Sequence, residues 1–161
     1  MATISRTLRP FLRSVRSHVR NYAEALRDDQ MKFTFAGANQ VFYDTKPVRQ
    51  VDVPSFSGSF GILPKHVPTL AVLKPGVVTV YEEDGTVKKV FVSSGTITIN
   101  DDSSVQILAE EAHPVENLDN GAAKEILSKA QQELSSASSD KDKAAAAIAV
   151  EVAEALVSAT Q

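Results

Sequence analysis

The chain of 161 residues contains no cysteine. This absence excludes disulfide scaffolds, thiolate zinc sites and cysteine nucleophiles. The chain also lacks any apolar run that approaches the roughly 20 residues a helix needs to cross a bilayer, so we expect no transmembrane span. Its length allows one ordinary domain, or a small domain with an appendage, and a core that needs no metal or disulfide.

Residues that commonly carry catalysis are scarce. After the first 22 residues only two histidines remain, His66 and His113, and they lie in different segments. A lone histidine is more often a structural donor or a contact than a catalyst. No nucleophile elbow, GxGxxG or GK[ST] sequence occurs in the chain. The sequence therefore predicts no catalytic residue, no nucleotide-binding site, no metal site and no cofactor.

Acidic residues are absent from the first 22 residues, where five arginines recur at spacings of three and four. This composition is typical of a mitochondrial transit peptide. Because Arg20 precedes Tyr22 in the manner of a matrix-protease site, we expect residues 1–22 to be removed and the mature chain to begin at Ala23. A basic arm that binds nucleic acid or lipid is the alternative. Residues 23–30 are predicted to form a short, flexible lead-in.

The remainder of the chain is acidic. Removing the five arginines from the 17 basic residues leaves 12, against 20 acidic residues, which is a net charge of −8. Such a body is a poor binder of nucleic acid, so no nucleic-acid partner is expected. No arginine follows Arg49.

Residues 31–116 are predicted to form a β-sandwich. Short β-prone runs follow one another here without a helical pattern between them, at 32–35, 40–43, 48–53, 77–81, 87–92, 96–100, 105–109 and 111–115. Pro54 is expected to end the third run, and Asp84-Gly85 to form a tight hairpin. Eight to ten strands of four to seven residues predict an antiparallel sandwich or a flattened barrel.

The stretch from Ser57 to Gly76 is unusually stiff and apolar. Its glycines and prolines are expected to shape a loop, because glycine permits conformations that side chains forbid and proline fixes φ; these residues are Gly58, Gly61, Pro64, Pro68, Pro75 and Gly76. We expect short extended pieces joined by rigid turns. An apolar, rigid loop is a candidate contact surface, and a wrapped corner of the sandwich is an equally good interpretation.

Residues 118–161 are predicted to form an antiparallel two-helix hairpin, which makes the fold class α+β. Asp119 or Asn120 can cap the first helix, and Ser139 or Asp140 the second. The predicted apolar stripes are Ala123, Ile126, Leu127, Ala130, Leu134 and Ala137 in the first helix, and Ala144, Ile148, Val152, Ala155 and Leu156 (or Ala159) in the second. A hairpin this small must pack on the sandwich or on another protein.

The chain resembles the mitochondrial delta subunits of F-type ATP synthases, the counterparts of the bacterial and chloroplast epsilon subunits. The resemblance covers residues 31–161. It is most specific in the pattern Gly58-x-Phe-Gly61-Ile-Leu-x-x-His66-x-Pro68-Thr-Leu-x-x-Leu-x-Pro75-Gly76, followed by Phe91-Val-Ser-Ser-Gly95 and Leu108-Ala-Glu-Glu-Ala112. A transit peptide in front fits the mitochondrial members.

This resemblance implies a non-catalytic central-stalk subunit of the rotor, peripheral to the inner mitochondrial membrane on its matrix side. It would clamp the gamma subunit, hold the small mitochondrial epsilon subunit and rest on the c-ring, and so couple proton-driven rotation to ATP synthesis. The family's c-ring contacts correspond to Ser59, Ile62, Leu63, Lys65 and His66.

Two departures from the family pattern limit what carries over. Many bacterial members have an acidic residue at the position of Ser59, so a charged contact there is not implied. Some bacterial members bind ATP or inhibit hydrolysis through an arginine-bearing hairpin, and here no arginine follows Arg49. The alternative function is a free-standing matrix sandwich that binds a small ligand between sheet and hairpin.

Overall fold

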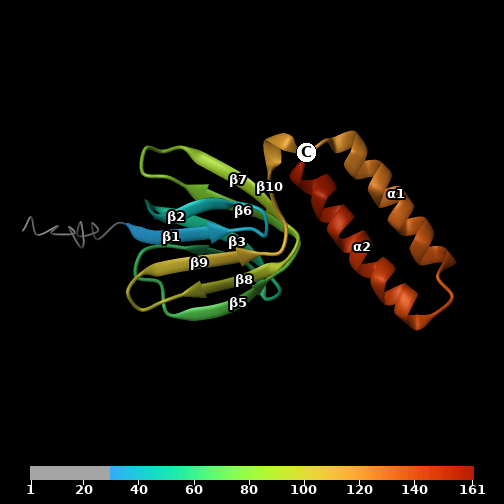
Figure 1. The fold of residues 1–161 in the computed structure, drawn as a ribbon, viewed down its shortest axis with the longest axis horizontal. Helices are drawn as coiled ribbons and strands as arrows, with labels where there is room; N and C mark the ends of the chain where they lie inside the picture. Colours follow the sequence, from blue (N-terminus) through green and yellow to red (C-terminus); the bar gives the residue numbers. More distant parts are fainter. Residues whose placement is uncertain (1–29) are drawn as a thin grey trace, which may run out of the picture.

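The computed structural model describes residues 30–161 (Figure 1); the predicted transit peptide and most of the predicted lead-in lie outside the described residues. Ten strands are followed by a 3₁₀ turn and two helices. In chain order the elements are β1 (Met31–Ala36), β2 (Val41–Val48), β3 (Gln50–Ser55), β4 (Gly58–Ile62), β5 (Thr69–Leu73), β6 (Gly76–Tyr81), β7 (Val87–Val92), β8 (Gly95–Ile99), β9 (Ser104–Ala109), β10 (Ala112–Pro114), η1 (Val115–Asn117), α1 (Asn120–Ser136) and α2 (Asp140–Ala159).

The strands form one sheet that curls over itself into a sandwich, as predicted. Their order is β10-β7-β6-β3-β5-β8-β9-β1-β2, with β4 paired to β3. β3 pairs along its first half with β6 and reaches β5 only through the Ser55–Leu73 pair, so it links the two layers. One detail of the prediction is wrong: β1 and β9 pair in parallel, while every other strand pair of the described residues is antiparallel.

The core lies between the layers and is made mainly by alternating, inward-facing residues along the strands. Its largest fully buried side chains are Phe33, Phe35, Met31, Ile62, Leu73, Ile97 and Ile107. Each buried side chain of this size stabilises the fold by about 1.5–3 kcal/mol relative to exposure. Two aromatic contacts extend the core toward β2: the Phe33 ring lies 5.2 Å from that of Tyr43, and the Phe35 ring lies 4.9 Å from that of Phe42.

Pro54 does not end its strand, in contrast to the prediction. β3 continues to Ser55, and the carbonyl of Pro54 accepts a hydrogen bond of 3.2 Å from the Lys74 amide. Proline lacks only the N–H, so it is tolerated near a strand end where no donor is required. Ser55 is the one buried polar residue of the described range, and its hydroxyl donates to the Gly58 carbonyl at 2.6 Å, closing the β3–β4 turn.

The stretch from Ser57 to Gly76 forms β4, a turn and β5, which confirms the expectation of short extended pieces joined by turns. The predicted Asp84-Gly85 turn is also present between β6 and β7. Gly85 has a φ of 87°, and the Asp84 carboxylate accepts a hydrogen bond of 2.8 Å from the Thr86 amide. Both turns therefore follow directly from local sequence.

The two helices form a hairpin, and at its open end a hydrogen bond joins the start of α1 to the residue after α2. Asp119 caps α1 through its carboxylate, and Ser139 caps α2 through its hydroxyl. Asn120, at the start of α1, donates from its side-chain amide to the Thr160 hydroxyl at 2.9 Å. α2 contacts both α1 and β6, and in Figure 1 it lies between α1 and the sandwich.

The predicted apolar stripe of the second helix is wrong in its first half, where Ala144 and Ile148 are both exposed. The residues buried in α2 are Ala146 and Ala153, while Ile148 is 63% exposed. In α1 the buried residues Ala123 and Ala130 belong to the predicted stripe. The helices meet through alanines because small side chains let their axes approach closely, so bulk was a poor guide to the contact.

Candidate functional site

The loop between β4 and β5 is held in one conformation by its backbone. The His66 amide donates to the Leu63 carbonyl at 3.1 Å, which closes a turn with Pro64 and Lys65 at its centre. Lys65 has a φ of 63°, a left-handed conformation that non-glycine residues rarely adopt. The Lys65 amide also donates to the Ser103 hydroxyl at 3.2 Å, which ties this loop to the β8–β9 turn.

The structure separates the five predicted contact residues. Leu63 is 57% exposed and Lys65 is exposed, whereas His66 is half-buried with its ring centroid 6.1 Å from that of Phe60. Ser59 is exposed but lies on β4, away from the turn. Ile62 is fully buried in the core, which corrects its assignment, because an inward residue of β4 cannot offer its side chain to a partner.

Two residues missed by the sequence argument extend the exposed apolar tip. Val67 is 69% exposed and Leu70 is 75% exposed. Val67 follows the turn directly and Leu70 is the second residue of β5, so the signal in the motif was apolar residues close to prolines. We call Leu63, Lys65, His66 and Val67 the tip loop.

The predicted shaping role of two glycines has a clear geometric basis. Gly58 has a φ of 119°, which side chains rarely permit. A Cβ at Gly61 would lie 2.8 Å from the Asp52 carboxylate on the neighbouring strand, closer than real Cβ contacts. The Asp52 carboxylate accepts hydrogen bonds from the side-chain amide of Gln50 at 2.6 Å and from the Tyr81 hydroxyl at 3.1 Å. These two bonds hold the carboxylate in place, so it cannot simply move aside.

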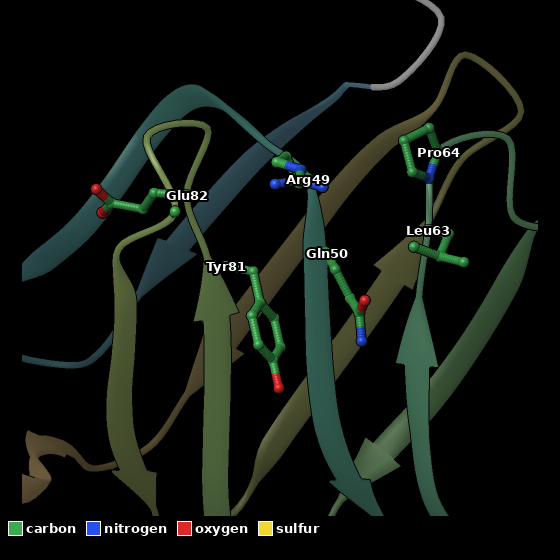
Figure 2. A pocket seen from close by; sticks show the side chains of 7 residues that line it. Arg49, Gln50, Leu63, Pro64, Tyr81 and Glu82 are labelled. Carbon is green, nitrogen blue, oxygen red and sulfur yellow. The ribbon is translucent and has the colours of Figure 1, made fainter.

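A cavity of about 420 Å³ lies beside the tip loop. Figure 2 shows Gln50 and Tyr81 pointing the same way from adjacent strands, with Leu63 and Pro64 across from them and Glu82 turned away. It is an open notch at the end of the sandwich. It does not lie between sheet and hairpin, where the ligand-binding alternative would place a pocket.

The central part of one outer face of the sandwich carries no charge; Lys32, the outward residue near the start of β1, lies at its edge. Its outward residues are Thr34, Ala36, Val41, Leu70, Val72, Thr96, Thr98, Gln106 and Leu108, which we call the uncharged face. Directly opposite neighbours join Val72 to Thr96, Thr96 to Leu108, Leu108 to Ala36 and Ala36 to Val41. This continuous row crosses five strands, about 19 Å at roughly 4.8 Å per strand step.

Within residues 30–161, no other element covers the uncharged face. Val41 is 63%, Val72 54% and Leu108 61% exposed. On the other outer face, Phe91 points outward from β7 yet is only 4% exposed, because α2 and η1 pack on β6 and β7. Exposed apolar side chains that gather on one face, here Val41, Leu70, Val72 and Leu108, are typical of protein interaction sites. The sequence partly indicated this face, since several strands carry apolar residues on both of their sides.

The two layers are fastened together at the end of the sandwich by Tyr43, Glu82 and Lys88. The Glu82 carboxylate accepts a hydrogen bond of 2.7 Å from Tyr43 and an ion pair of 2.8 Å from Lys88. Hydrogen bonds from Lys88 and then from Tyr43 hold the pKa of Glu82 below its ordinary value. Burial first, and the bond to Glu82 second, raises the pKa of Tyr43 well above its ordinary value.

The two histidines of the described range lie apart from each other, each in a local contact. Within residues 30–161, no three side chains of the His, Asp and Glu type are placed to hold a metal ion. His113 lies 3.5 Å from the Glu111 carboxylate, and His66 contacts the Val67 carbonyl at 2.9 Å. Neither described helix is long and apolar enough to span a membrane.

The fold and its surfaces define a class: a β-sandwich with a C-terminal helical hairpin that offers a wide exposed face without charge and a rigid tip. Residues 30–115 match the family model of the ATP synthase delta/epsilon chain, β-sandwich domain. The chain belongs to this family, among the mitochondrial ATP synthase delta subunits.

Two curated relatives carry that assignment. The chain is 47% identical over 131 residues to the mitochondrial ATP synthase subunit delta of Caenorhabditis elegans, covering 81% of this chain and 80% of that one. It is 44% identical over 142 residues to the same subunit of Pichia angusta, covering 88% of each. Among solved structures, a chain of the Euglena gracilis mitochondrial ATP synthase, OSCP/F1/c-ring, matches with a TM-score of 0.77 and 25% identity over 87% of both chains.

Proposed function

We propose that this chain is a non-catalytic subunit of the central stalk of mitochondrial ATP synthase, placed on the matrix side of the inner membrane. It joins the gamma subunit to the c-ring, also contacts the small mitochondrial epsilon subunit, and helps to transmit proton-driven rotation to ATP synthesis. Family membership favours this role over a free-standing ligand-binding sandwich.

The observation that carries this proposal is the uncharged face. In a chain whose part outside residues 1–22 has a net charge of −8, nine neighbouring outward positions have no charged side chain. Burying Val41, Val72 and Leu108 removes apolar area from water at about 25 cal/mol per Å². Charged residues are depleted at the cores of protein interfaces. We assign this face to the gamma subunit, because that contact must be the widest and the most resistant to slipping.

We assign the tip loop to the c-ring. It combines exposed Leu63 and Val67 with a positive charge at Lys65, and its backbone is fixed by the Leu63–His66 and Lys65–Ser103 hydrogen bonds. A contact that transmits torque needs a fixed shape, since a mobile loop would absorb displacement. Two separate surfaces on one stiff sandwich therefore support a joining role.

The assignment of the uncharged face is tested by Leu108→Glu, with Val87→Glu as the matched control. Val87 is 48% exposed and lies on β7, outside the uncharged face. Both variants should fold, since both positions are exposed. In mitochondria that carry only the variant, we expect Leu108→Glu to reduce the amount of this chain that co-purifies with gamma and to reduce proton-coupled ATP synthesis, while Val87→Glu behaves as wild type.

Folding of both purified mature chains is checked by circular dichroism and thermal unfolding. Normal co-purification and normal synthesis with folded Leu108→Glu would contradict the assignment of this face. An equal loss with Val87→Glu would show that the effect does not depend on the uncharged face.

A further inference from the structure

β4 has a free edge. Its five residues pair with β3, and with no other strand of the described chain. A strand at the edge of a sheet presents N–H and C=O groups that have no ladder partner. Which groups of β4 face outward follows from the residue opposite Ser59.

That residue is Pro54. Its carbonyl accepts from the Lys74 amide at 3.2 Å, so it points away from β4, and proline has no N–H. In an antiparallel ladder, a residue whose backbone groups point away from a neighbouring strand forms a non-hydrogen-bonded pair with the residue opposite it on that strand. Both residues of such a pair point their N–H and C=O groups away from each other. The N–H and C=O of Ser59 therefore face away from β3. By the two-residue alternation, those of Gly61 do so as well.

These four backbone groups are accessible. Ser59 and Gly61 are both exposed, and within residues 30–161 no hydrogen bond to their outward groups is found. Their side chains are a hydroxymethyl group and a hydrogen atom, so little covers the backbone. Opposite Gly61, the Asp52 carboxylate is half-buried and bonded to two neutral groups, and it forms no ion pair in the described chain.

The other edges of the sandwich are protected and β4 is not. β2 contains Lys46 and Pro47, and its pairing with β1 is irregular. β10 has three residues and ends at Pro114. β5 is joined to β3 at its last residue and is flanked by prolines. β4 has no charge, no proline and a regular register, so it lacks the devices by which proteins prevent strand addition.

We propose that the outer edge of β4 is a strand-addition site, where an extended segment of a neighbouring stalk polypeptide pairs with the backbone of Ser59 and Gly61. This inference rests on the proposed function. β4 runs directly into the tip loop, so one partner can cover both. Main-chain hydrogen bonds supply the affinity of such sites, and side chains at alternate positions supply the specificity.

The specificity is set on the face that carries Asp52. A partner residue opposite Gly61 projects its side chain toward the Asp52 carboxylate, across a position where Gly61 has no side chain of its own. A long basic side chain can reach this carboxylate, which forms no ion pair in the described chain. The segment is therefore extended, with lysine or arginine at the position opposite Gly61.

Amide hydrogen exchange tests this directly, read at single residues in the purified mature chain and in intact ATP synthase. The Ser59 and Gly61 amides should exchange fast in the free chain and at least about tenfold more slowly in the complex. The Phe60 amide, bonded to β3, should be slow in both. Fast exchange of Ser59 and Gly61 in the complex would overturn the inference, and a selective loss of co-purification with gamma in Leu108→Glu would still leave the proposed function standing.

Two further outcomes also decide the matter. Slow exchange of the Ser59 and Gly61 amides in the free chain, at any concentration, would show that the edge is closed by the chain itself or by a second copy, and would overturn the inference. Ser59→Pro removes one outward donor without breaking the β3 ladder, and Ser59→Ala is the control that keeps the donor. If a strand is added, the Gly61 amide in the complex should exchange fast in the Ser59→Pro variant and stay slow in the Ser59→Ala variant. Slow exchange of this amide in both variants would overturn the inference.

Discussion

The Tyr43 hydroxyl on β2 donates a hydrogen bond of 2.7 Å to the Glu82 carboxylate, which follows β6 in the opposite layer. The two residues are 39 positions apart in the chain, and their bond closes the end of the sandwich next to the tip loop. Lys88 completes the group from β7. These three side chains link the two layers at the end of the sandwich where the proposed role requires stiffness.

Removing the hydroxyl should destabilise the fold measurably. We expect Tyr43→Phe to lower the free energy of unfolding by about 1–3 kcal/mol, since a hydrogen bond to a charged acceptor is lost while the buried ring remains. Thermal or urea unfolding of the mature chain at pH 7 measures this. A change below about 0.3 kcal/mol would show that water replaces the hydroxyl without cost.

The same pair predicts a pH window. The pKa of Glu82 is lowered in the folded chain, so its contribution is present above its ordinary value of 4.5 and is lost as pH falls through the folded pKa. The pKa of Tyr43 is raised, so its contribution is complete below 10.0 and is lost as pH rises beyond that value. The stability difference between wild type and Tyr43→Phe should therefore shrink below about pH 4.5 and above about pH 10. A difference that is constant from pH 3 to 11 would contradict the assigned ionisations.

Neighbouring residues Ile62 and Leu63 should respond in opposite ways to the same substitution. Ile62→Asp places a carboxylate in the core and should prevent the sandwich from folding, because an unpaired buried charge costs several kcal/mol. Leu63→Asp changes an exposed side chain and should leave the unfolding temperature nearly unchanged. It should instead weaken attachment to the membrane sector, measured as release of the catalytic head from membranes. Normal attachment with Leu63→Asp would remove the tip loop from the c-ring contact.

The turn at Lys65 is predicted to be strained. Lys65→Gly should raise the free energy of unfolding by about 0.5–1 kcal/mol, because glycine adopts a φ of 63° without steric cost. Lys65→Ala removes the same charge but keeps the Cβ, so it should give no such gain. Equal stabilisation by both substitutions would mean that the charge, and not the backbone, is responsible.

Much of the fold could be predicted from local sequence. Alternation located most strands, and Asp84-Gly85 located a turn, because these signals act within a few residues. The parallel pairing of β1 with β9 could not be predicted in this way, because it joins residues about 70 positions apart. The same reason explains the uncharged face: Val41, Val72 and Leu108 come to lie in one row only when five strands assemble.

The candidate site shows a similar division. The glycines and prolines of the tip region indicated a rigid loop, and the structure shows how Gly58 and Gly61 contribute. The burial of Ile62 could not be predicted from the family pattern, because the pattern does not say which phase of β4 faces inward. In α2, alanines form the helix contact where the larger Ile148 was expected.

The central claim is that this chain resides in mitochondrial ATP synthase as a stalk subunit. Native gel electrophoresis of mitochondria solubilised in mild detergent, followed by detection of the mature chain, tests it most directly. The account predicts that nearly all of the chain migrates with the assembled synthase. A monomer-sized pool as the main species would contradict it.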